Sequence, residues 1–415
     1  MDIIEFLNSS PTQFHSAATI ASELVRNGFA ELNECDEWAL VHGGKYFVQR
    51  NNSSVIAFRT GDLCNPKLAV CHTDSPSMKL RLKDASVQDG LLRIPVEVYG
   101  GASNPTWLDR PLKVVGRAFF SDADSVLKYH LISSDSPKAV IPNPPIHFVN
   151  LNDGLKYNQQ NQLAAMLPYS SLQAFVDSIT PAGFPQQPAE SLQAELYLAD
   201  AQKAILIDGD IPLLQATHLD NLTSCHAVLN ALCDCENPRS TIVGGFFDLE
   251  EVGLNFQSAG SNFLRCILER IVLATQKPAS LQALHRMLAT ATALSIDVAH
   301  AFHPNFQEKF DKAMSPVIGK GPAIKFHANQ RYATTLPGAV MLRELAKKAS
   351  LMIQDFTPRS DMGCGSTIGP MIAGSLGIQT IDIGVAIWAM HSIRETCASK
   401  DVQTLTSLVK AFYAS

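Results

Sequence analysis

Six side chains of the kinds that bind metal through nitrogen or oxygen are spread along this 415-residue chain: His72, Asp220, Glu250, Glu251, Asp297 and His391. Glu250 and Glu251 are adjacent and follow the apolar run at 242–247. Neighbouring side chains on a strand point to opposite faces, so both serve one site only where the strand ends. There, one carboxylate can bind a metal ion while the other takes a proton from the attacking water.

His72 closes another apolar, strand-like run at 67–71. Strand ends are where α/β enzymes place their chemistry. Asp74, two residues further on, can accept the second imidazole N–H and so fix the tautomer that binds metal. A His-x-Asp sequence by itself is weak support, because most such histidines are ordinary surface or core residues.

Three further candidates also follow, or begin, predicted elements. Asp297 closes an apolar strand, and His391 follows the last predicted strand. Asp220 precedes a helical run, where it either bridges two cations with its two oxygens or caps the helix. Because the set contains no cysteine, it suits zinc, cobalt or manganese in a hydrolytic site rather than a structural zinc site.

Other catalytic patterns fit less well. The chain contains neither a Gly-x-Ser-x-Gly elbow nor a Walker loop. The glycine-rich segment 363–369 lacks the lysine of a phosphate-binding loop. We interpret it as a tight turn beside the substrate, whose N–H groups stabilise an oxyanion, with Cys364 as a nucleophile the alternative.

The pattern of the elements predicts two domains. After residue 219, strand-like runs alternate with helical patterns, as in βαβ units. We therefore expect residues 1–84 and 208–415 to form one α/β domain with a doubly wound mixed sheet. Residues 85–207 alternate in polarity between turn signals, which indicates an inserted β-rich domain. Within it, segment 170–195 is predicted to be a weakly ordered connector or lid.

Composition excludes several classes of partner. A formal charge of −6 and a pI near 6.1 provide no basic surface for nucleic acid or anionic lipid. No apolar run approaches the roughly 20 residues that span a bilayer, and the acidic start is unlike a secretory signal. The nine cysteines are odd in number and irregularly spaced, which favours reduced thiols and a cytoplasmic location.

Taken together, seven short strings resemble the M18 metallopeptidases, the aspartyl aminopeptidases. They occur in family order at 72–76, 219–222, 250–253, 297–305, 329–334, 364–370 and 390–395. The resemblance therefore spans nearly the whole chain. It implies a metallopeptidase domain interrupted by a β-rich oligomerisation domain, which is where the predicted insertion lies.

The resemblance also implies two zinc ions per subunit, for which cobalt or manganese can substitute. One metal would be held by His72 and Glu251, the other by Asp297 and His391, with Asp220 as the bridge. The division of ligands between the two metals is less defined than the set itself.

The remaining site residues are likewise implied by the resemblance. Glu250 would be the general base that activates the water between the metals, and Asp74 would support His72. Lys325 corresponds to the family lysine that pairs with an acidic substrate residue, although by itself it ranks no higher than Arg331 or Arg359. Tyr332 belongs to the same substrate-binding region.

The family assembles as a tetrahedral dodecamer, so self-association is expected. His147 and His303 would lie near subunit contacts and bind substrate there, or they pack as ordinary interface residues. The expected activity is removal of N-terminal Asp or Glu from peptides with a free N-terminus. An aminopeptidase with another N-terminal preference, an N-acyl amino acid deacylase or carboxypeptidase, and a non-catalytic scaffold are the alternatives.

Overall fold

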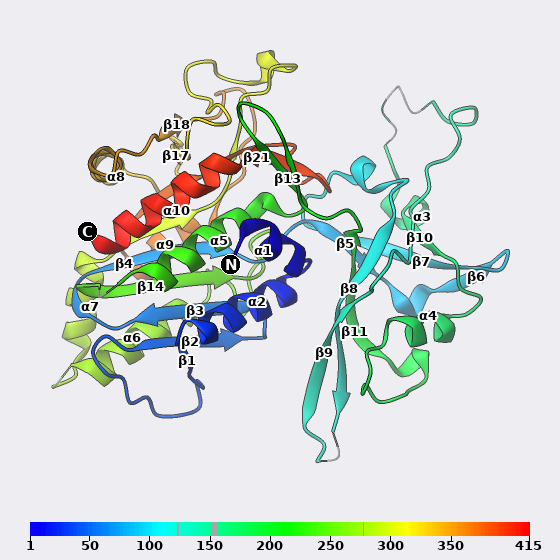
Figure 1. Ribbon diagram of the computed structural model, residues 1–415, viewed down its shortest axis with the longest axis horizontal. Helices are drawn as coiled ribbons and strands as arrows, with labels where there is room; N and C mark the ends of the chain where they lie inside the picture. The colour runs from blue at the N-terminus through cyan, green and yellow to red at the C-terminus, as the bar shows by residue number, and fades with distance from the viewer. Residues whose placement is uncertain (123, 151–153, 155, 237, 277) are drawn as a thin grey trace. The chain divides into compact units, whose positions relative to one another are not determined.

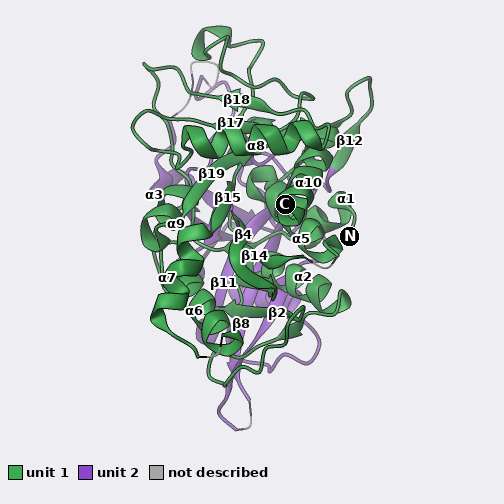
Figure 2. Ribbon diagram, turned by 90° about the vertical axis from the view of Figure 1, so that its left-hand side faces the viewer, with its two compact units in different colours: residues 1–74, 205–390, 395–415 green, residues 75–204, 391–394 purple. Residues whose placement is uncertain are grey.

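The computed structural model describes residues 1–122, 124–150, 154, 156–236, 238–276 and 278–415. The chain divides into two compact units, shown in green and purple in Figure 2. Unit 1 comprises Met1–Asp74, Ile205–Met390 and Glu395–Ser415. Unit 2 comprises Ser75–Ala204 and His391–Arg394. None of the helices in the described ranges is long and apolar enough to cross a bilayer.

A mixed sheet forms the centre of unit 1. Its strands, in spatial order, are β1 (Ala30–Glu31), β2 (Lys45–Arg50), β3 (Ser54–Arg59), β14 (Ser240–Phe247), β4 (Asp62–His72), β15 (Thr292–Ile296), β19 (Gln379–Gly384), β17 (Ala323–Lys325) and β18 (Gln354–Phe356). The four strands β14, β4, β15 and β19 run parallel to one another. Phe247 pairs with His72, so neighbouring strands end at the same edge.

Helices cover both faces of this sheet, which confirms the doubly wound α/β prediction. The helices of unit 1 are α1 (Ile3–Ser9), α2 (Gln13–Arg26), α5 (Leu219–Asp234), α6 (Phe263–Thr275), α7 (Leu281–Thr290), α8 (Leu336–Lys348), α9 (Ile368–Leu376) and α10 (Ser399–Ala414). Helices α6, α7 and α9 share one apolar core with the strands. Helices α5 and α10 cross in front of β4 and β14 in Figure 1.

Gly244 of β14 shows why α5 can lie so near the sheet. A Cβ atom at Gly244 would stand 3.2 Å from side-chain carbons of both Leu232 and Val228 on α5. The absence of a side chain at Gly244 therefore allows close packing of α5, the helix that carries Asp220 in its first turn.

Unit 1 contains a second, smaller sheet. Its strands, in order, are β12 (Ile205–Ile207), β13 (Leu213–Ala216), β21 (Glu395–Ala398), β20 (Ala386–Trp388) and β16 (Ala299–His300).

Unit 2 is built on an antiparallel sheet, as its alternating sequence predicts. The strands are β10 (Ala164–Leu167), β7 (Leu91–Tyr99), β5 (Ser77–Leu80), β11 (Gln193–Asp200), β8 (Leu112–Ser121) and β9 (Leu127–Ser133), with β6 (Ser86–Gln88) beside β7. Two short helices accompany them, α3 (Gln159–Gln162) and α4 (Leu172–Ile179). Trp107 is 1% exposed and belongs to its apolar core.

The boundaries of the inserted unit differ from the predicted 85–207. It begins at Ser75, because β5 pairs with β7 and β11 of the same unit. It ends at Ala204, because β12 pairs with β13 of unit 1. The segment 391–394 also joins unit 2: Ile393 is buried in its core, and its N–H donates to Thr106 Oγ1 at 3.0 Å.

The prediction of a weakly ordered connector or lid at 170–195 is wrong for the first part of that segment. Residues 172–179 form α4, capped by Ser171, whose hydroxyl accepts the N–H of Ala174 at 3.1 Å. Phe175 and Val176 on this helix are buried in the core of unit 2. The proline and serine residues on either side indicated a loop, but the short segment between them has an apolar helix face that packs into the core of unit 2.

Candidate metal centre

Three of the predicted ligands come together in unit 1. His72 ends β4, Asp220 lies at the start of α5, and Glu251 follows β14. One potential ligand atom from each lies within 4.8 Å of the others. The Nε2 atom of His72 is 3.3 Å from Oδ1 of Asp220, and both side chains are buried. The elements that position this cluster are therefore the ends of adjacent strands and the helix packed on them.

Asp297 joins the same cluster. It follows β15, which lies beside β4 in the sheet, and its backbone N–H donates to Ile383 O at 3.0 Å. Its Oδ1 atom is 3.6 Å from Nε2 of His72. Three predicted carboxylate ligands, Asp220, Glu251 and Asp297, thus lie around the imidazole of the fourth, His72.

Asp74 has two roles in this geometry. The Nδ1 atom of His72 lies 3.0 Å from the carbonyl oxygen of Asp74 and 3.5 Å from its Oδ1. If Nδ1 carries the proton, Nε2 is the ring nitrogen that binds metal. The carboxylate of Asp74 also accepts the backbone N–H of Glu250 at 3.1 Å and of Glu251 at 3.2 Å. Asp74 therefore holds both the imidazole and the turn that carries the two glutamates.

The electrostatics of the cluster fit divalent cations. Burial raises the pKa of Glu250 to about 8; the His72 charge opposes this shift, and the negative charge of Asp297 adds to it. Burial lowers the pKa of His72, but hydrogen bonds to Asp220 and Asp297 outweigh it and hold that pKa well above its usual value. Buried carboxylates at this density require cations. The nitrogen and oxygen donors match zinc.

The fifth predicted ligand, His391, belongs to the 391–394 segment of unit 2. Its Nδ1 atom is 3.2 Å from the carbonyl oxygen of Gly101, and its own carbonyl accepts the N–H of Ser103 at 2.9 Å. A proton on Nδ1 would make Nε2 the metal-binding nitrogen. Its role as a ligand stays a prediction.

Lys325 is 2% exposed and contacts a metal-ligand candidate. Its Nζ atom lies 3.1 Å from Oδ2 of Asp297, 3.0 Å from the Asp297 carbonyl and 2.8 Å from the Val298 carbonyl. An ammonium group has three N–H donors, and these three oxygens match them. The structure therefore gives Lys325 a contact with Asp297 that its sequence did not indicate, and its substrate-binding role stays a prediction.

Tyr332 lies beside this lysine. Its ring centroid is 5.0 Å from Nζ of Lys325, and its hydroxyl is 3.1 Å from Sγ of Cys364. Burial, together with the Cys364 contact, raises the pKa of Tyr332. Cys364 is half-buried against this phenol, so the structure gives it a packing partner.

The two histidines expected near subunit contacts lie in different units. His303 is half-buried in unit 1, with its ring 5.0 Å from that of Phe306 and 6.2 Å from that of Trp388. His147 is exposed in unit 2, next to Phe148, which is 84% exposed. Contact of His147 and His303 with substrate stays a prediction.

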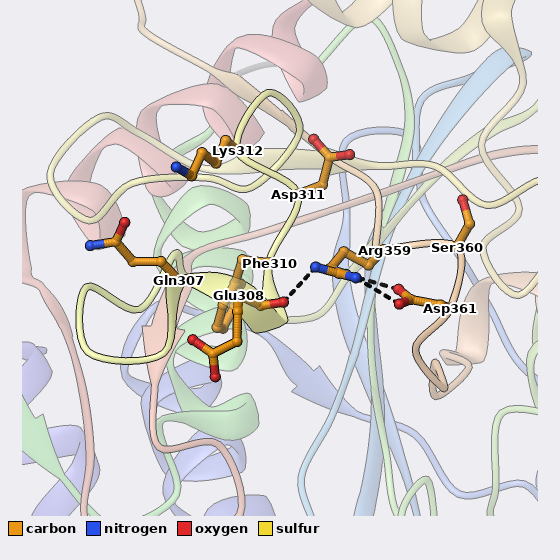
Figure 3. Close-up of a pocket in the computed structure, with 8 residues that line it drawn as sticks. All are labelled: Gln307, Glu308, Phe310, Asp311, Lys312, Arg359, Ser360 and Asp361. Atoms are coloured by element: carbon orange, nitrogen blue, oxygen red, sulfur yellow. Dashed lines mark hydrogen bonds and ion pairs between the residues drawn. The ribbon is translucent and has the colours of Figure 1, made fainter.

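An open hollow of about 680 Å³ on unit 1 includes Arg359, another cation considered for substrate binding (Figure 3). The Nε and Nη2 atoms of Arg359 donate to the two carboxylate oxygens of Asp361 at 2.8 and 2.6 Å. A third bond joins Arg359 to the carbonyl oxygen of Glu308. The charge of Arg359 is therefore already paired with a neighbouring carboxylate.

Two buried acids of unit 1, Glu395 and Asp382, were not predicted as functional residues. Glu395 is 2% exposed, and its Oε2 accepts the backbone N–H of Asp220 at 2.9 Å. Asp382 lies fully buried in β19. A signal was present for Asp382: an acid between Ile381 and Ile383 in an apolar run must find partners when buried. For Glu395 the only signal was its place at the end of the 390–395 string.

Comparison with known proteins agrees with a zinc-binding cluster in this chain. The family described as aminopeptidase I zinc metalloprotease (M18) matches residues 6–413. The probable M18 family aminopeptidase 2 of Pseudomonas entomophila is 38% identical over 427 residues, covering 100% of this chain and 97% of that protein. The chain belongs to the M18 family of zinc metallo-aminopeptidases, which confirms the resemblance stated above.

Solved structures agree with this family. The structure of the Ape4 and Nbr1 complex aligns with a TM-score of 0.93 and 31% identity, covering 100% of this chain and 85% of the other. The S. cerevisiae mApe1 dodecamer aligns with a TM-score of 0.83 and 28% identity, covering 99% and 95%.

Proposed function

We propose that this M18 protein is a di-zinc aminopeptidase that hydrolyses the N-terminal bond of peptides and prefers N-terminal Asp or Glu. The observation that carries the proposal is the cluster of His72, Asp220 and Glu251, whose ligand atoms lie within 4.8 Å of one another. Glu250 is next to this cluster in the sequence and supplies the uncoordinated carboxylate that hydrolysis requires.

The ligands divide as the family resemblance implies. His72 and Glu251 would hold one zinc ion, Asp297 and His391 the other, and Asp220 would bridge them; cobalt or manganese would substitute. When bound, zinc polarises the scissile carbonyl and makes water a nucleophile near neutral pH. The backbone N–H of Asp220 donates to Glu395, which fixes the start of α5.

Glu250 acts as the general base. Its carboxylate takes a proton from the attacking water and passes that proton to the nitrogen of the departing peptide. The hydrogen bonds from Glu250 and Glu251 N–H to Asp74 hold the turn, so the two adjacent carboxylates keep separate tasks.

Acidic preference requires a cation, because a substrate carboxylate removed from water must be paired. We assign that cation to Lys325, with Tyr332 forming part of the same pocket. Support comes from the position of Lys325 next to the metal centre: its Nζ atom is 3.1 Å from Oδ2 of Asp297 and 5.0 Å from the Tyr332 ring centroid. We also propose a cytoplasmic location, because the nine cysteines are free thiols.

We further propose that the protein assembles as a homo-oligomer, a tetrahedral dodecamer in which the β-rich unit 2 makes subunit contacts. The yeast relative mApe1 is a dodecamer. His147 and His303 would lie near these contacts and reach substrate. The exposed Ile146 and Phe148 beside His147 favour an apolar contact there. Light scattering on the purified protein tests the subunit number.

The activity is tested with zinc-loaded protein and matched peptides that begin with Asp, Glu, Leu, Lys or acetylated Asp. We expect cleavage only of free acidic N-termini, and Glu250→Gln to lower kcat by about 10²- to 10⁴-fold with zinc retained. Cleavage of the Leu or Lys peptides would mean a different pocket. Cleavage of only the acetylated peptide would identify a deacylase, and no cleavage a scaffold.

A further inference from the structure

Asp382 is a fully buried carboxylate that joins two loops. It lies in β19, and its side chain faces two donors from elsewhere in unit 1. Oδ1 accepts the hydroxyl of Thr367 at 2.6 Å, and Oδ2 accepts the backbone N–H of Ala333 at 2.6 Å. The backbone N–H of Asp382 donates to Thr334 Oγ1 at 2.9 Å. These bonds join β19 to two segments that are remote in sequence.

Residues 331–334 and 364–367, which we call the paired segments, are also bonded directly to each other. The hydroxyl of Ser366 donates to the carbonyl of Arg331 at 3.0 Å. The hydroxyl of Tyr332 lies 3.1 Å from the thiol of Cys364. Because Asp382 is bonded to both segments, it is a buried anchor that links the paired segments to β19.

The backbone around the anchor is built for a carboxylate. A Cβ atom at Gly369 would stand 2.4 Å from Oδ2 of Asp382, so only glycine leaves space there. Thr367 caps α9, where the positive end of the helix dipole favours a negative group. Burial raises the pKa of Asp382, while the charge of Lys325 and the bond from Thr367 oppose that rise.

The paired segments lie beside the metal centre. The Tyr332 ring is 5.0 Å from Nζ of Lys325, and this Nζ donates to Oδ2 of Asp297 at 3.1 Å. The other oxygen of Asp297 is 3.6 Å from His72. A shift of the paired segments would therefore displace groups next to the candidate metal ligands.

We propose that Asp382 is a positioning residue for aminopeptidase action: it fixes the paired segments so that they hold the first residue of the substrate against the metal centre. The inference rests on the proposed function. Asp382 itself touches neither substrate nor metal in this role, and it acts through Tyr332 and Ala333.

The test compares Asp382→Ala with Asp382→Asn in the full-length, zinc-loaded protein. The alanine variant removes both acceptors. The asparagine variant keeps one acceptor, because its carbonyl can accept from Ala333 N–H, and it replaces the other with a donor, because its amide N–H can donate to the hydroxyl oxygen of Thr367. We expect Asp382→Ala to raise KM for acidic dipeptides by at least about tenfold, with kcat changed much less and zinc content unchanged, and Asp382→Asn to restore most of the loss.

Asp401 provides the matched control, because it too is a fully buried acid with both carboxylate oxygens hydrogen-bonded, in its case to two backbone N–H groups. Its oxygens bind Gly319 N–H at 2.7 Å and Gly321 N–H at 2.8 Å. Asp401→Ala should lower thermal stability without the rise in KM. Hydrogen exchange gives a second readout: the Ala333 amide should exchange faster in Asp382→Ala and not in Asp401→Ala.

An active wild type combined with unchanged KM in Asp382→Ala, or with an equal rise in Asp401→Ala, overturns the positioning role alone. A wild type that cleaves none of the peptides overturns the proposed function and the positioning role together. The two failures are therefore distinguishable.

Discussion

Lys325 donates hydrogen bonds to both the carboxylate and the backbone carbonyl of Asp297, at 3.1 and 3.0 Å. The ammonium group of Lys325 thus binds the carboxylate of Asp297, a candidate metal ligand, and fixes its orientation. Partners of this kind orient metal ligands and tune their affinity. Two roles for Lys325 therefore have to be distinguished, orienting Asp297 and pairing with an acidic substrate. They predict different effects of a Lys325 substitution on zinc affinity and on activity.

Lys325→Met removes the cation but keeps much of the apolar stem. If Lys325 holds Asp297, we expect zinc affinity to fall by about 10- to 100-fold. Activity should then fall on every substrate alike. Competition with a zinc-binding dye measures the affinity, and the exposed Lys348→Met is the control. Unchanged affinity with loss of activity on acidic peptides alone would assign Lys325 to substrate recognition only.

Asp74→Asn tests the turn that carries the two glutamates. The new amide cannot accept both backbone N–H groups, so one of the bonds from Glu250 and Glu251 is lost. We expect a loss of about 1–3 kcal/mol in unfolding free energy, together with lower kcat. Denaturant unfolding and steady-state kinetics measure the two, with the exposed Asp36→Asn as control. Wild-type values for both would show that Asp74 does not support the site.

Gly384→Ala is expected to damage the metal centre from a distance along the chain. A Cβ atom at Gly384 would stand 1.8 Å from the backbone oxygen of Asp297, so the ligand-bearing strand end must move. We expect Gly384→Ala to bind zinc more weakly and to unfold at a lower temperature, and calorimetry measures both. Gly374→Ala on α9 meets nothing within 4 Å and should stabilise by about 0.5–1 kcal/mol. Equal zinc affinity in both variants would contradict this account.

Acid should destabilise the protein partly through His15. Burial lowers the pKa of His15 to about 4 in the folded state, against about 6.5 when unfolded. Between these values only the unfolded chain binds the proton, so this contribution to stability is lost as pH falls from about 6.5 towards 4.

His15→Gln removes that contribution. Between pH 7 and pH 5 we expect wild-type unfolding free energy to fall by about 2 kcal/mol more than that of the variant. Urea unfolding at each pH measures the difference, and the exposed His42→Gln is the control. A parallel pH dependence in wild type and His15→Gln would exclude His15 as the source.

Strand ends were predictable because their pattern is local. His72 and Asp297 each follow a run of apolar residues, and a run of that kind predicts a buried strand whatever lies beside it. The parallel order of β14, β4 and β15 then brings these ends to one edge. Three of the candidate ligands, His72, Glu251 and Asp297, could be grouped from sequence for this reason.

Long-range pairing could not be predicted in the same way. The limits of the inserted unit depend on which strands β5 and β12 join, and their partners are remote in sequence. The contact between Lys325 and Asp297 and the link from Glu395 to Asp220 likewise arise only in the folded chain. Local pattern carries no information about such partners.

The four-residue return of the chain into unit 2 at His391–Arg394 limits how this protein can be rebuilt. Exchanging residues 75–204 for the corresponding part of another protein would take away Gly101 and Thr106, which bond to His391 and Ile393. The inserted unit is therefore not an independent cassette. Recombination or domain grafting has to transfer two separate pieces of the gene together, or the residue expected to complete the metal centre loses its support.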